Sequence, residues 1–443
     1  MSESLTAVVL AAGKGTRMKS GRAKVLHPLA GRTLIGHVLA IAGQLEPDKA
    51  VVVLAQDMDD VASEVKKADI ETAIAVQDPP LGTGHALMAA RNDLPSAGDI
   101  LVLYGDTPLL TPGTLMQLLA RRRDANAAVA VFGIRPPDPN GYGRLRFEGE
   151  ALIELVEERH ADEALKRDGL CNAGIMAIDA SRMGVLLDSL ELKQPKGEYY
   201  LTDIVEHACE RGWSCVAVEG PWEEGHGVNA QHQLAEAEAV VQRRLRLAAM
   251  ESGVIMTAPE TVHLSADTKL APGVEVQPHV VFGPKVQVAE GAIIKSFSHL
   301  EGADVGPAAV IGPYARLRPG SEIGQQARVG NFVETKNTVL EAGAKANHLT
   351  YLGDAHIGAK SNIGAGTITC NYDGFNKYQT EIGAGVFIGS NSALVAPLTV
   401  ADGAMVGAGS TITSNVPADD LALARSRQTN LPEGAARFRA GRS

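Results

Sequence analysis

Small residues and cations gather close to the N-terminus. An apolar run ends at Leu10, the next loop holds Lys14 between two glycines, and Arg17 and Lys24 lie downstream. Glycine lets backbone amides face phosphate oxygens, while lysine and arginine neutralise their charge. The loop is neither GxxxxGK[ST] nor GxGxxG. A phosphate-binding loop is therefore one interpretation, and an ordinary strand-to-helix turn is the other.

A carboxylate stands where an open α/β sheet would bind a ligand. Asp106 follows the candidate strand Ile100–Tyr104, and such sheets bind ligands at the carboxyl ends of their strands. The helix-capping role is already taken by Thr111, which precedes Pro112. Beside a phosphate, a carboxylate would be repulsive without a cation between them, and Mg²⁺ suits such oxygen ligands. Asp106 is therefore a candidate magnesium ligand.

A second polar group lies in the second half of the chain. His348 is a candidate general base, because an imidazole can take the proton from an amine that attacks a thioester. A solvated histidine is the alternative, since the chain has 12 histidines. Others in this half are His263, His279, His299 and His356. Arg318 and Lys336 are expected to point outward, where they would suit a phosphorylated sugar. Tyr351, Asn362 and Tyr372 would complete such a site.

A six-residue period predicts the element that carries this second group. The aliphatic positions are Ile382, Ile388, Leu394, Val400, Val406 and Ile412. Neither a helix nor a strand repeats every six residues, whereas one flat side of a triangular parallel β-helix does. The same frame occurs upstream at Val274, Val280, Val286, Val305, Ile311, Leu317, Ile323, Val329, Ile357 and Ile363. A solenoid of roughly nine coils is expected from Ser252 to Val416, with a loop expelled at Thr369–Thr380. A β-sandwich is the alternative.

The first half alternates strand-like and helix-like segments, which predicts an open α/β sheet. The candidate strands are Ala7–Leu10, Ala50–Leu54, Thr72–Val76, Ile100–Tyr104, Ala127–Ile134 and Ser214–Val218. Helices are expected over 111–123 and 198–210. An amphipathic helix over 229–251, serving as a spacer, joins the two halves. The expected domains are therefore 1–228, the linker helix 229–251, and 252–443.

Composition excludes several classes of function. The net charge of -11 and the pI of about 5.6 argue against a nucleic-acid or membrane-surface protein. The four cysteines lack CxxC spacing, which indicates reduced thiols in a cytoplasm rather than a disulfide framework or a zinc site. No apolar run reaches transmembrane length. We therefore expect a cytoplasmic protein that binds neither nucleic acid nor membrane.

Motifs of the first half occur in the order found in the sugar nucleotidyltransferases, which this half closely resembles. The first motif is LxxGxGTRM at residues 10–18, followed by Lys24. The others are Gln77 with the segment 79–86, Tyr104-Gly105-Asp106, the segment 141–144, Glu157, and the segments 172–174 and 227–229. Residues 20–23 lack the proline often seen before the lysine. The resemblance implies attack of a sugar-1-phosphate on the α-phosphorus of UTP, which expels pyrophosphate, with Arg17 and Lys24 as catalytic cations. It implies Mg²⁺ held by Asp106 and Asn229. The implied UTP and UDP-N-acetylglucosamine positions are Leu10, Ala11, Ala12, Gly13, Lys24, Gln77, Gly82, Thr83, Tyr104, Gly105, Asp106, Gly143, Glu157, Asn172 and Asn229.

The second half resembles the hexapeptide-repeat acyltransferases, whose prism is left-handed. The run 315–374 is similar, almost residue for residue, to the acetyltransferase domain of the bifunctional N-acetylglucosamine-1-phosphate uridyltransferase/glucosamine-1-phosphate acetyltransferase family. The resemblance implies that His348 is the base and that the enzyme is a homotrimer with acetyl-transfer sites between subunits. Implied amino-sugar-phosphate positions are Arg318, Lys336, Tyr351 and Asn362, and implied acetyl-CoA positions are Ala365, Asn371, Tyr372, Ser390, Ala408 and Arg425. The implied fold class is an α/β Rossmann-like nucleotidyltransferase sheet followed by an all-β left-handed parallel β-helix.

Three functional hypotheses follow. The first is one enzyme that acetylates glucosamine-1-phosphate with acetyl-CoA and then transfers a uridylyl group from UTP. The second is a nucleotide-sugar pyrophosphorylase whose β-helix serves assembly or regulation, against which the presence of His348 and Asn362 argues. The third is a non-enzymatic binding or exchange-factor subunit, against which four residues argue, namely Lys14, Arg17, Lys24 and Asp106.

Overall fold

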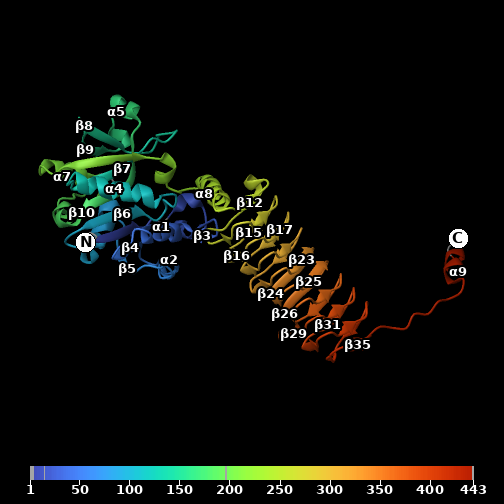
Figure 1. Ribbon diagram of the computed structural model, residues 1–443. Helices are drawn as coiled ribbons and strands as arrows, with labels where there is room; N and C mark the ends of the chain where they lie inside the picture. The colour runs from blue at the N-terminus through green and yellow to red at the C-terminus, as the bar shows by residue number, and fades with distance from the viewer. Residues whose placement is uncertain (1–3, 14, 195–196, 442–443) are drawn as a thin grey trace. The chain divides into compact units, whose positions relative to one another are not determined.

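The computed structural model of the protein describes residues 4–13, 15–194 and 197–441 (Figure 1). Lys14, the lysine of the glycine-rich loop, lies outside the described residues. The chain divides into two compact units after Gln242, which lies within helix α8 (Gln231–Glu251). None of the helices in these described ranges is long and apolar enough to cross a membrane.

The first unit is built on a mixed sheet with the strand order β11-β7-β10-β6-β1-β4-β5, and β8 and β9 form an appended ribbon. The strands are β1 (Leu5–Leu10), β4 (Lys49–Ala55), β5 (Thr72–Gln77), β6 (Asp99–Tyr104), β7 (Val129–Ile134), β8 (Arg144–Glu148), β9 (Ala151–Val156), β10 (Cys171–Asp179) and β11 (Cys215–Gly220). β10 runs antiparallel to both of its main neighbours, β6 and β7. The predicted strands coincide with β1, β4, β5, β6, β7 and β11, whereas β8, β9 and β10 were not predicted.

Helices cover both faces of this sheet, so its central strands are apolar throughout. One face packs against α1 (Leu34–Gly43), α2 (Asp59–Val65) and α4 (Pro112–Asp124), and the other against α3 (Thr83–Ala89), α6 (Ala180–Asp188) and α7 (Asp203–Glu210). The short elements are β2 (Pro28–Leu29), β3 (Arg32–Thr33) and α5 (Glu163–Asp168). The hydroxyl of Thr111 accepts a hydrogen bond from the Thr114 amide at 3.3 Å, which confirms the predicted cap of α4.

The helix predicted over 198–210 begins only at Asp203, so the prediction is wrong for residues 198–202. The Tyr199 amide donates to the Leu81 carbonyl, and the Tyr199 carbonyl accepts from the Gly84 amide, both at 2.8 Å. These bonds hold residues 198–200 against the start of α3. A backbone that pairs with a distant segment cannot also make the hydrogen bonds of a helix, so α7 begins only after these residues.

The second unit is a parallel β-helix in which each coil stacks on the coil before it (Figure 1). One side contains β12 (Ile255–Met256), β14 (Glu275–Val276), β17 (Ile293–Ile294), β20 (Val310–Ile311), β23 (Arg328–Asn331), β25 (Lys345–His348), β27 (Asn362–Ile363), β30 (Phe387–Ile388), β33 (Met405–Val406) and β35 (Leu421–Ala422). The other sides contain β13 (Lys269–Leu270), β15 (Val281–Phe282), β16 (Val286–Val288), β18 (His299–Leu300), β19 (Ala303–Val305), β21 (Arg316–Leu317), β22 (Ser321–Ile323), β24 (Glu334–Leu340), β26 (Tyr351–Ile357), β28 (Ile368–Cys370), β29 (Thr380–Ile382), β31 (Ala393–Val395), β32 (Leu398–Val400) and β34 (Thr411–Ile412).

The six-residue frame forms the core of this prism. Each aliphatic side chain from Ile382 to Ile412 in that frame is at most 4% exposed. Residues of successive coils are in register, as in the series Ile363, Ile388 and Val406. The predicted fold class, an α/β nucleotidyltransferase sheet followed by a left-handed parallel β-helix, is confirmed.

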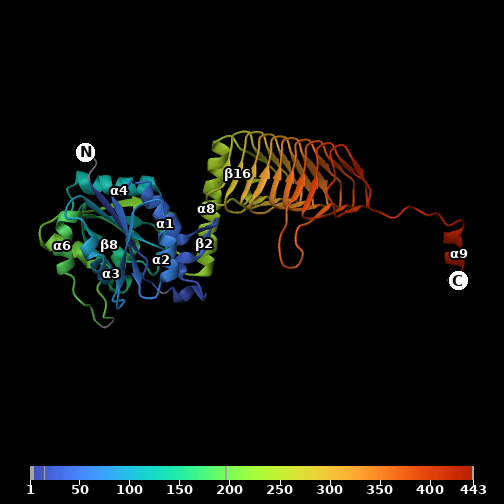
Figure 2. The same ribbon diagram turned by 90° about the horizontal axis from the view of Figure 1, so that it is seen from below.

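The solenoid differs from the prediction at its end. β35 pairs with β33, so the coils continue past Val416 to Ala422 before the chain leaves toward α9 (Gly434–Ala440). The expelled loop is where it was expected: residues 371–379 leave the prism between β28 and β29, as the orange loop in Figure 2 shows. Within it, Phe375 and Asn376 donate their backbone amides to the Asp373 carboxylate at 2.8 and 2.7 Å, which folds the tip of the loop into a turn.

Candidate active sites

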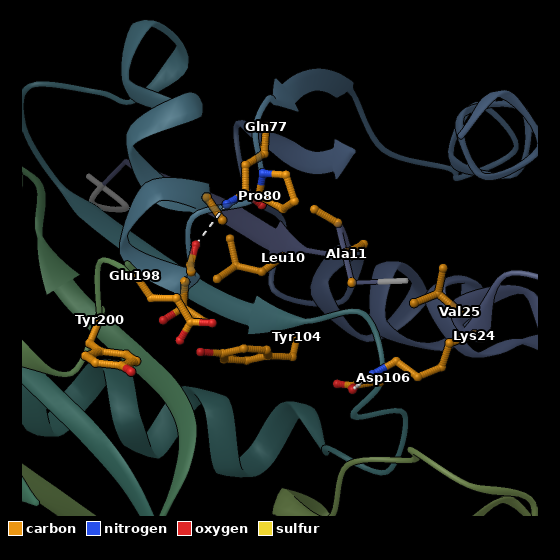
Figure 3. A pocket seen from close by; sticks show the side chains of 15 residues that line it. Leu10, Ala11, Lys24, Val25, Gln77, Pro80, Tyr104, Asp106, Glu198 and Tyr200 are labelled. Carbon is orange, nitrogen blue, oxygen red and sulfur yellow. Dashed lines mark hydrogen bonds and ion pairs between the residues drawn. The ribbon is translucent and has the colours of Figure 1, made fainter. Parts of the chain in front are cut away.

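A cavity of about 320 Å³ opens at the carboxyl ends of β1 and β6. These strands are parallel neighbours with Leu10 opposite Tyr104, so the loops that follow them lie side by side. Ligands are expected at this end of an open α/β sheet. The predicted residues that line the cavity are Leu10, Ala11, Ala12, Gly13, Lys24, Gln77, Gly82, Thr83, Tyr104 and Asp106 (Figure 3). Gly105 packs beneath it, since a Cβ at that position would lie 3.1 Å from the Ala11 Cβ.

Cations and oxygen ligands meet at one edge of this cavity. The Lys24 ammonium donates to the Asp106 carboxylate and, at 3.1 Å, to the Asn229 side-chain oxygen. Arg17 donates to that same Asn229 oxygen at 2.8 Å. The Val228 amide donates to the Asp106 main-chain carbonyl at 2.8 Å, which fixes residue 229 beside the end of β6. The structure thus brings together four predicted residues that the sequence spreads over more than 200 positions.

The donor set at this edge suits a hard cation. One carboxylate and one amide oxygen converge on the point that the Lys24 ammonium occupies, and Mg²⁺ is commonly held by one or two protein oxygens together with substrate phosphates. Within the described ranges of the chain, no cluster of three or more His, Cys, Asp or Glu side chains could hold a metal ion. The residues present therefore fit a magnesium ion that shares its coordination with a bound nucleotide.

Hydrogen bonds and a close backbone contact fix the part of the cavity wall around Gln77 and Gly82. Gln77 donates its amide to the Gly82 carbonyl at 2.9 Å, so its side chain is fixed at the cavity wall. Gly82 has a φ of 94°, and a Cβ there would lie 2.6 Å from the Tyr199 carbonyl oxygen, so this position requires glycine. Thr83 begins α3 and accepts a hydrogen bond from the Leu201 amide at 3.1 Å.

A second cavity of about 380 Å³ shares Tyr104 and Asp106 with the first, and Asn172 and Asn229 also line it. Gly143 and Glu157 do not line either cavity. The Gly143 carbonyl accepts from the Asn172 amide at 2.9 Å, and so holds that asparagine in place.

The Tyr104 phenol stays protonated at neutral pH. Burial raises the pKa of Tyr104 well above its ordinary value, and the charges of Asp106 and Glu157 raise it further, while a hydrogen bond with Thr83 opposes the rise. A protonated phenol at the junction of the two cavities can donate a hydrogen bond to a sugar or phosphate oxygen.

Several lining residues were missed by the sequence analysis. Val25, Glu198 and Tyr200 also line the first cavity, together with Pro80 and Ala86 of the predicted motif 79–86, and Figure 3 shows Glu198 and Tyr200 on the same side of it as Tyr104. The helix predicted over 198–210 concealed Glu198 and Tyr200, because it gave no reason to place residues 198–200 beside α3. The wall that they form makes the cavity deeper than the phosphate loop alone would.

In the second unit, His348 belongs to a column of residues that stack from coil to coil. Asn331 on β23 lies opposite His348 on β25. The Gly366 amide donates to the His348 carbonyl at 3.4 Å. In the next two coils the same backbone bond recurs, from the Asn391 amide to the Ala365 carbonyl and from the Gly409 amide to the Ser390 carbonyl, both at 2.8 Å. The column above the imidazole is therefore Ala365, Ser390 and Ala408, which are three predicted acetyl-CoA positions. Small side chains at ~4.8 Å intervals leave a shallow track along the prism.

The predicted cations stand on the neighbouring side of the prism. Arg318 donates to the Glu334 carboxylate at 2.9 Å, and the Lys336 ammonium lies 3.8 Å from the Asp354 carboxylate. The Lys377 ammonium, together with partial burial, lowers the pKa of Lys336, although Asp354 opposes this shift.

The remaining predicted residues lie around these two groups. Tyr351 begins β26 opposite Glu334, and Asn362 begins β27 opposite Lys345. Asn371 donates to the Asp354 carboxylate, while Tyr372 stands exposed in the expelled loop. Arg425 follows β35 and packs over Gly409, where a Cβ would lie 3.9 Å from the arginine Cδ.

The fold and the two sites define a nucleotidyltransferase joined to a hexapeptide-type β-helix. Residues 7–170 match the MobA-like NTP transferase domain family. "Bifunctional protein GlmU" of Azorhizobium caulinodans is 54% identical over 444 residues, covering 100% of this chain and 99% of that protein. The protein of the same name from Paramagnetospirillum magneticum is 53% identical over 441 residues, covering 99% and 97%. A solved UDP-glucose pyrophosphorylase complexed with UDP-glucose is 15% identical, covers 54% of this chain and 99% of that one, and has a TM-score of 0.46. The chain belongs to the GlmU family of bifunctional proteins.

Proposed function

We propose that this enzyme catalyses two successive transfers in the synthesis of UDP-N-acetylglucosamine. The second unit moves the acetyl group of acetyl-CoA to glucosamine-1-phosphate, and the first unit moves the uridylyl group of UTP to N-acetylglucosamine-1-phosphate with release of pyrophosphate. The observation that supports this most is that one chain carries two separate polar sites, the cluster of Lys24, Asp106 and Asn229 and the column that contains His348. The working domains are 1–228 and 252–443, joined by the linker helix 229–251.

Uridylyl transfer requires positioning and charge neutralisation more than a base. Asp106 and Asn229 would hold Mg²⁺, which supplies positive charge to the phosphate oxygens. Arg17 and Lys24, which already contact these ligands, neutralise the charge that develops on the leaving pyrophosphate. Gln77 on the wall of the first cavity orients uracil, and the sugar phosphate occupies the second cavity beside Asn172.

Acetyl transfer requires a base and a bound phosphate. His348 takes a proton from the amine of the sugar as the nitrogen attacks the thioester carbonyl, and the coenzyme A thiolate leaves. Arg318 and Lys336 bind the sugar phosphate, assisted by Tyr351 and Asn362. The pantetheine arm lies along the small residues above the imidazole, Ala365, Ser390 and Ala408, and Asn371, Tyr372 and Arg425 complete the acetyl-CoA site.

The homotrimer, with acetyl-transfer sites between subunits, and a cytoplasmic location also belong to this proposal. So do partners limited to small-molecule substrates, without nucleic acid or membrane. The alternative of a pyrophosphorylase with an inert β-helix is not favoured, because the relatives named as bifunctional proteins above align with this chain over nearly their whole length.

The test follows coenzyme A thiol and pyrophosphate separately in the purified protein. With glucosamine-1-phosphate, acetyl-CoA, UTP and Mg²⁺, both products are expected, and pyrophosphate should depend on acetyl-CoA. Asp106→Ala should abolish pyrophosphate release and spare thiol release, whereas His348→Ala should do the reverse. Loss of both activities in either folded variant would contradict the assignment of two sites. Absence of thiol release from the unaltered protein would reduce the β-helix to an assembly module.

A further inference from the structure

The side chain of Asn331 touches the imidazole of His348. Its Oδ1 lies 2.6 Å from Nδ1 of the ring. The two residues occupy the same position in consecutive coils, on β23 and β25, and each precedes a corner residue of left-handed backbone, Phe332 with φ 55° and Leu349 with φ 50°. The contact thus follows from the stacking of the coils and involves one asparagine that the proposed mechanism does not use.

This contact determines which ring nitrogen is free. An amide oxygen can only accept a hydrogen bond, so the neutral imidazole must carry its proton on Nδ1. The lone pair is then on Nε2, which is the nitrogen able to take a proton. The main chain is fixed separately, because the Thr350 hydroxyl donates to the His348 carbonyl at 2.8 Å. Asn331 therefore constrains the ring itself.

Charged side chains lie on the strands next to His348, whereas the direct partner of the imidazole is neutral. Lys345 lies on the same strand as His348, Arg328 pairs with Lys345 from the strand below, and Asn362 pairs with it from the strand above. Glu334 and Lys336 lie on the neighbouring side of the prism. A carboxylate at position 331 would favour imidazolium, which cannot act as a base, whereas an amide accepts the same hydrogen bond without adding negative charge.

We propose that Asn331 is a positioning residue of the acetyl transfer, which holds His348 in the Nδ1-protonated tautomer with Nε2 directed away from Asn331. The inference rests on the proposed function of His348 as the base. It assigns a role in acetyl transfer to Asn331, which lies 17 positions before His348, at the same place in the preceding coil.

Two variants test this role. Asn331→Leu has a similar shape but no acceptor, so kcat for acetyl transfer should fall about 10- to 100-fold while KM for both substrates stays within about threefold. Asn331→Asp restores the acceptor, so most activity should return at high pH. The acidic limb of its pH–rate profile should move up by about one pH unit, because the carboxylate stabilises imidazolium.

A direct measurement reads the tautomer in the full-length protein. With ¹⁵N-labelled histidine, the His348 signals are assigned by their loss in His348→Gln. They should show Nδ1–H in the unaltered protein, and Asn331→Leu should lose that preference. Gln287→Leu, which removes an exposed amide from β16, is the matched control and should change nothing. Uridylyl transfer, measured in every variant, reports correct folding of the first unit, and the melting curve reports the second.

The outcomes separate the inference from the function on which it rests. If His348→Ala retains acetyl transfer, the proposed base is wrong. If His348→Ala is inactive but Asn331→Leu keeps more than half of kcat with an unmoved pH profile, the role of Asn331 is refuted. An Nε2–H tautomer in the unaltered protein would also refute it.

Discussion

Gly330 sets the distance between the two coils that carry Asn331 and His348. A Cβ at Gly330 would overlap the Asn347 carbonyl oxygen and lie 2.6 Å from the carbonyl carbon, whereas ordinary contacts begin at 3.4 Å. In Gly330→Ala the two strands must therefore separate by at least the difference, about 0.8 Å. A separation of this size along the direction of the bond would lengthen the 2.6 Å between Asn331 Oδ1 and His348 Nδ1 to about 3.4 Å. A hydrogen bond of that length is beyond the usual 2.7–3.2 Å range.

Gly330→Ala should thus reduce acetyl transfer to the level of Asn331→Leu, about 10- to 100-fold below the unaltered enzyme. The crowding should also cost about 1–3 kcal/mol of the free energy of unfolding of the second unit. Uridylyl transfer should not change. The assay measures thiol release and pyrophosphate release separately, each with its own substrate supplied in excess, and a urea titration followed by circular dichroism measures stability.

Gly283→Ala is the control, because a Cβ there would lie 3.1 Å from the Glu301 Cβ and 3.2 Å from the Leu300 carbonyl oxygen, so the neighbouring coil needs to shift by only about 0.3 Å. The double variant Gly330→Ala/Asn331→Leu should be no slower than the slower single variant, since both substitutions remove the same hydrogen bond between Asn331 and His348. Fully additive losses would refute the reasoning, as would a Gly330→Ala enzyme with normal acetyl transfer.

Two further predictions concern the cations of each site. Lys24 occupies the oxygens of Asp106 and Asn229, so Lys24→Met should bind Mn²⁺ several-fold more tightly without nucleotide, measured by electron paramagnetic resonance, while losing uridylyl transfer. The Lys377 ammonium and partial burial lower the pKa of Lys336, so Lys336 loses its charge at a lower pH than an ordinary lysine. KM for glucosamine-1-phosphate should therefore rise as pH increases, and Lys336→Arg should remove this rise because arginine stays charged.

Each of these predictions has a contrary outcome. Weaker Mn²⁺ binding in Lys24→Met would mean that the ammonium does not compete with the metal. An alkaline rise in KM that persists in Lys336→Arg would assign the titration to another group.

The β-helix could be predicted because its signal is local. An aliphatic residue faces the core at every sixth position, and each coil repeats the pattern, so the phase of a short stretch such as 382–412 predicts both the strands and much of the core. Its end could not be predicted in the same way. β35 places Leu421 and Ala422 in the last coil, but residues 417–420 interrupt the frame before it.

The first unit was predicted less completely because its missing parts depend on distant pairings. β10 runs antiparallel between β6 and β7, and nothing in its own residues indicates that partner choice. Glu198 and Tyr200 were assigned to a helix because their backbone bonds with the start of α3 cannot be read from the sequence. Asn229 was placed beside Asp106 by resemblance alone. For Asn331, the hexads gave only an approximate signal: three hexads span 18 residues, whereas Asn331 precedes His348 by 17, so the pairing depends on the actual stacking of the coils.

Each coil of the β-helix is stabilised mainly by the coils beside it. Within the part of the chain that the structure describes, β35 pairs with β33 on one side and with no strand on the other, so fraying under mild heat or urea should begin there and proceed inward. Ala408 and Arg425 lie in this outer part, whereas His348 lies several coils deeper. Mild denaturation should therefore weaken retention of the coenzyme first, while proton transfer persists at saturating acetyl-CoA. The enzyme would then lose acetylation in stages rather than in a single step.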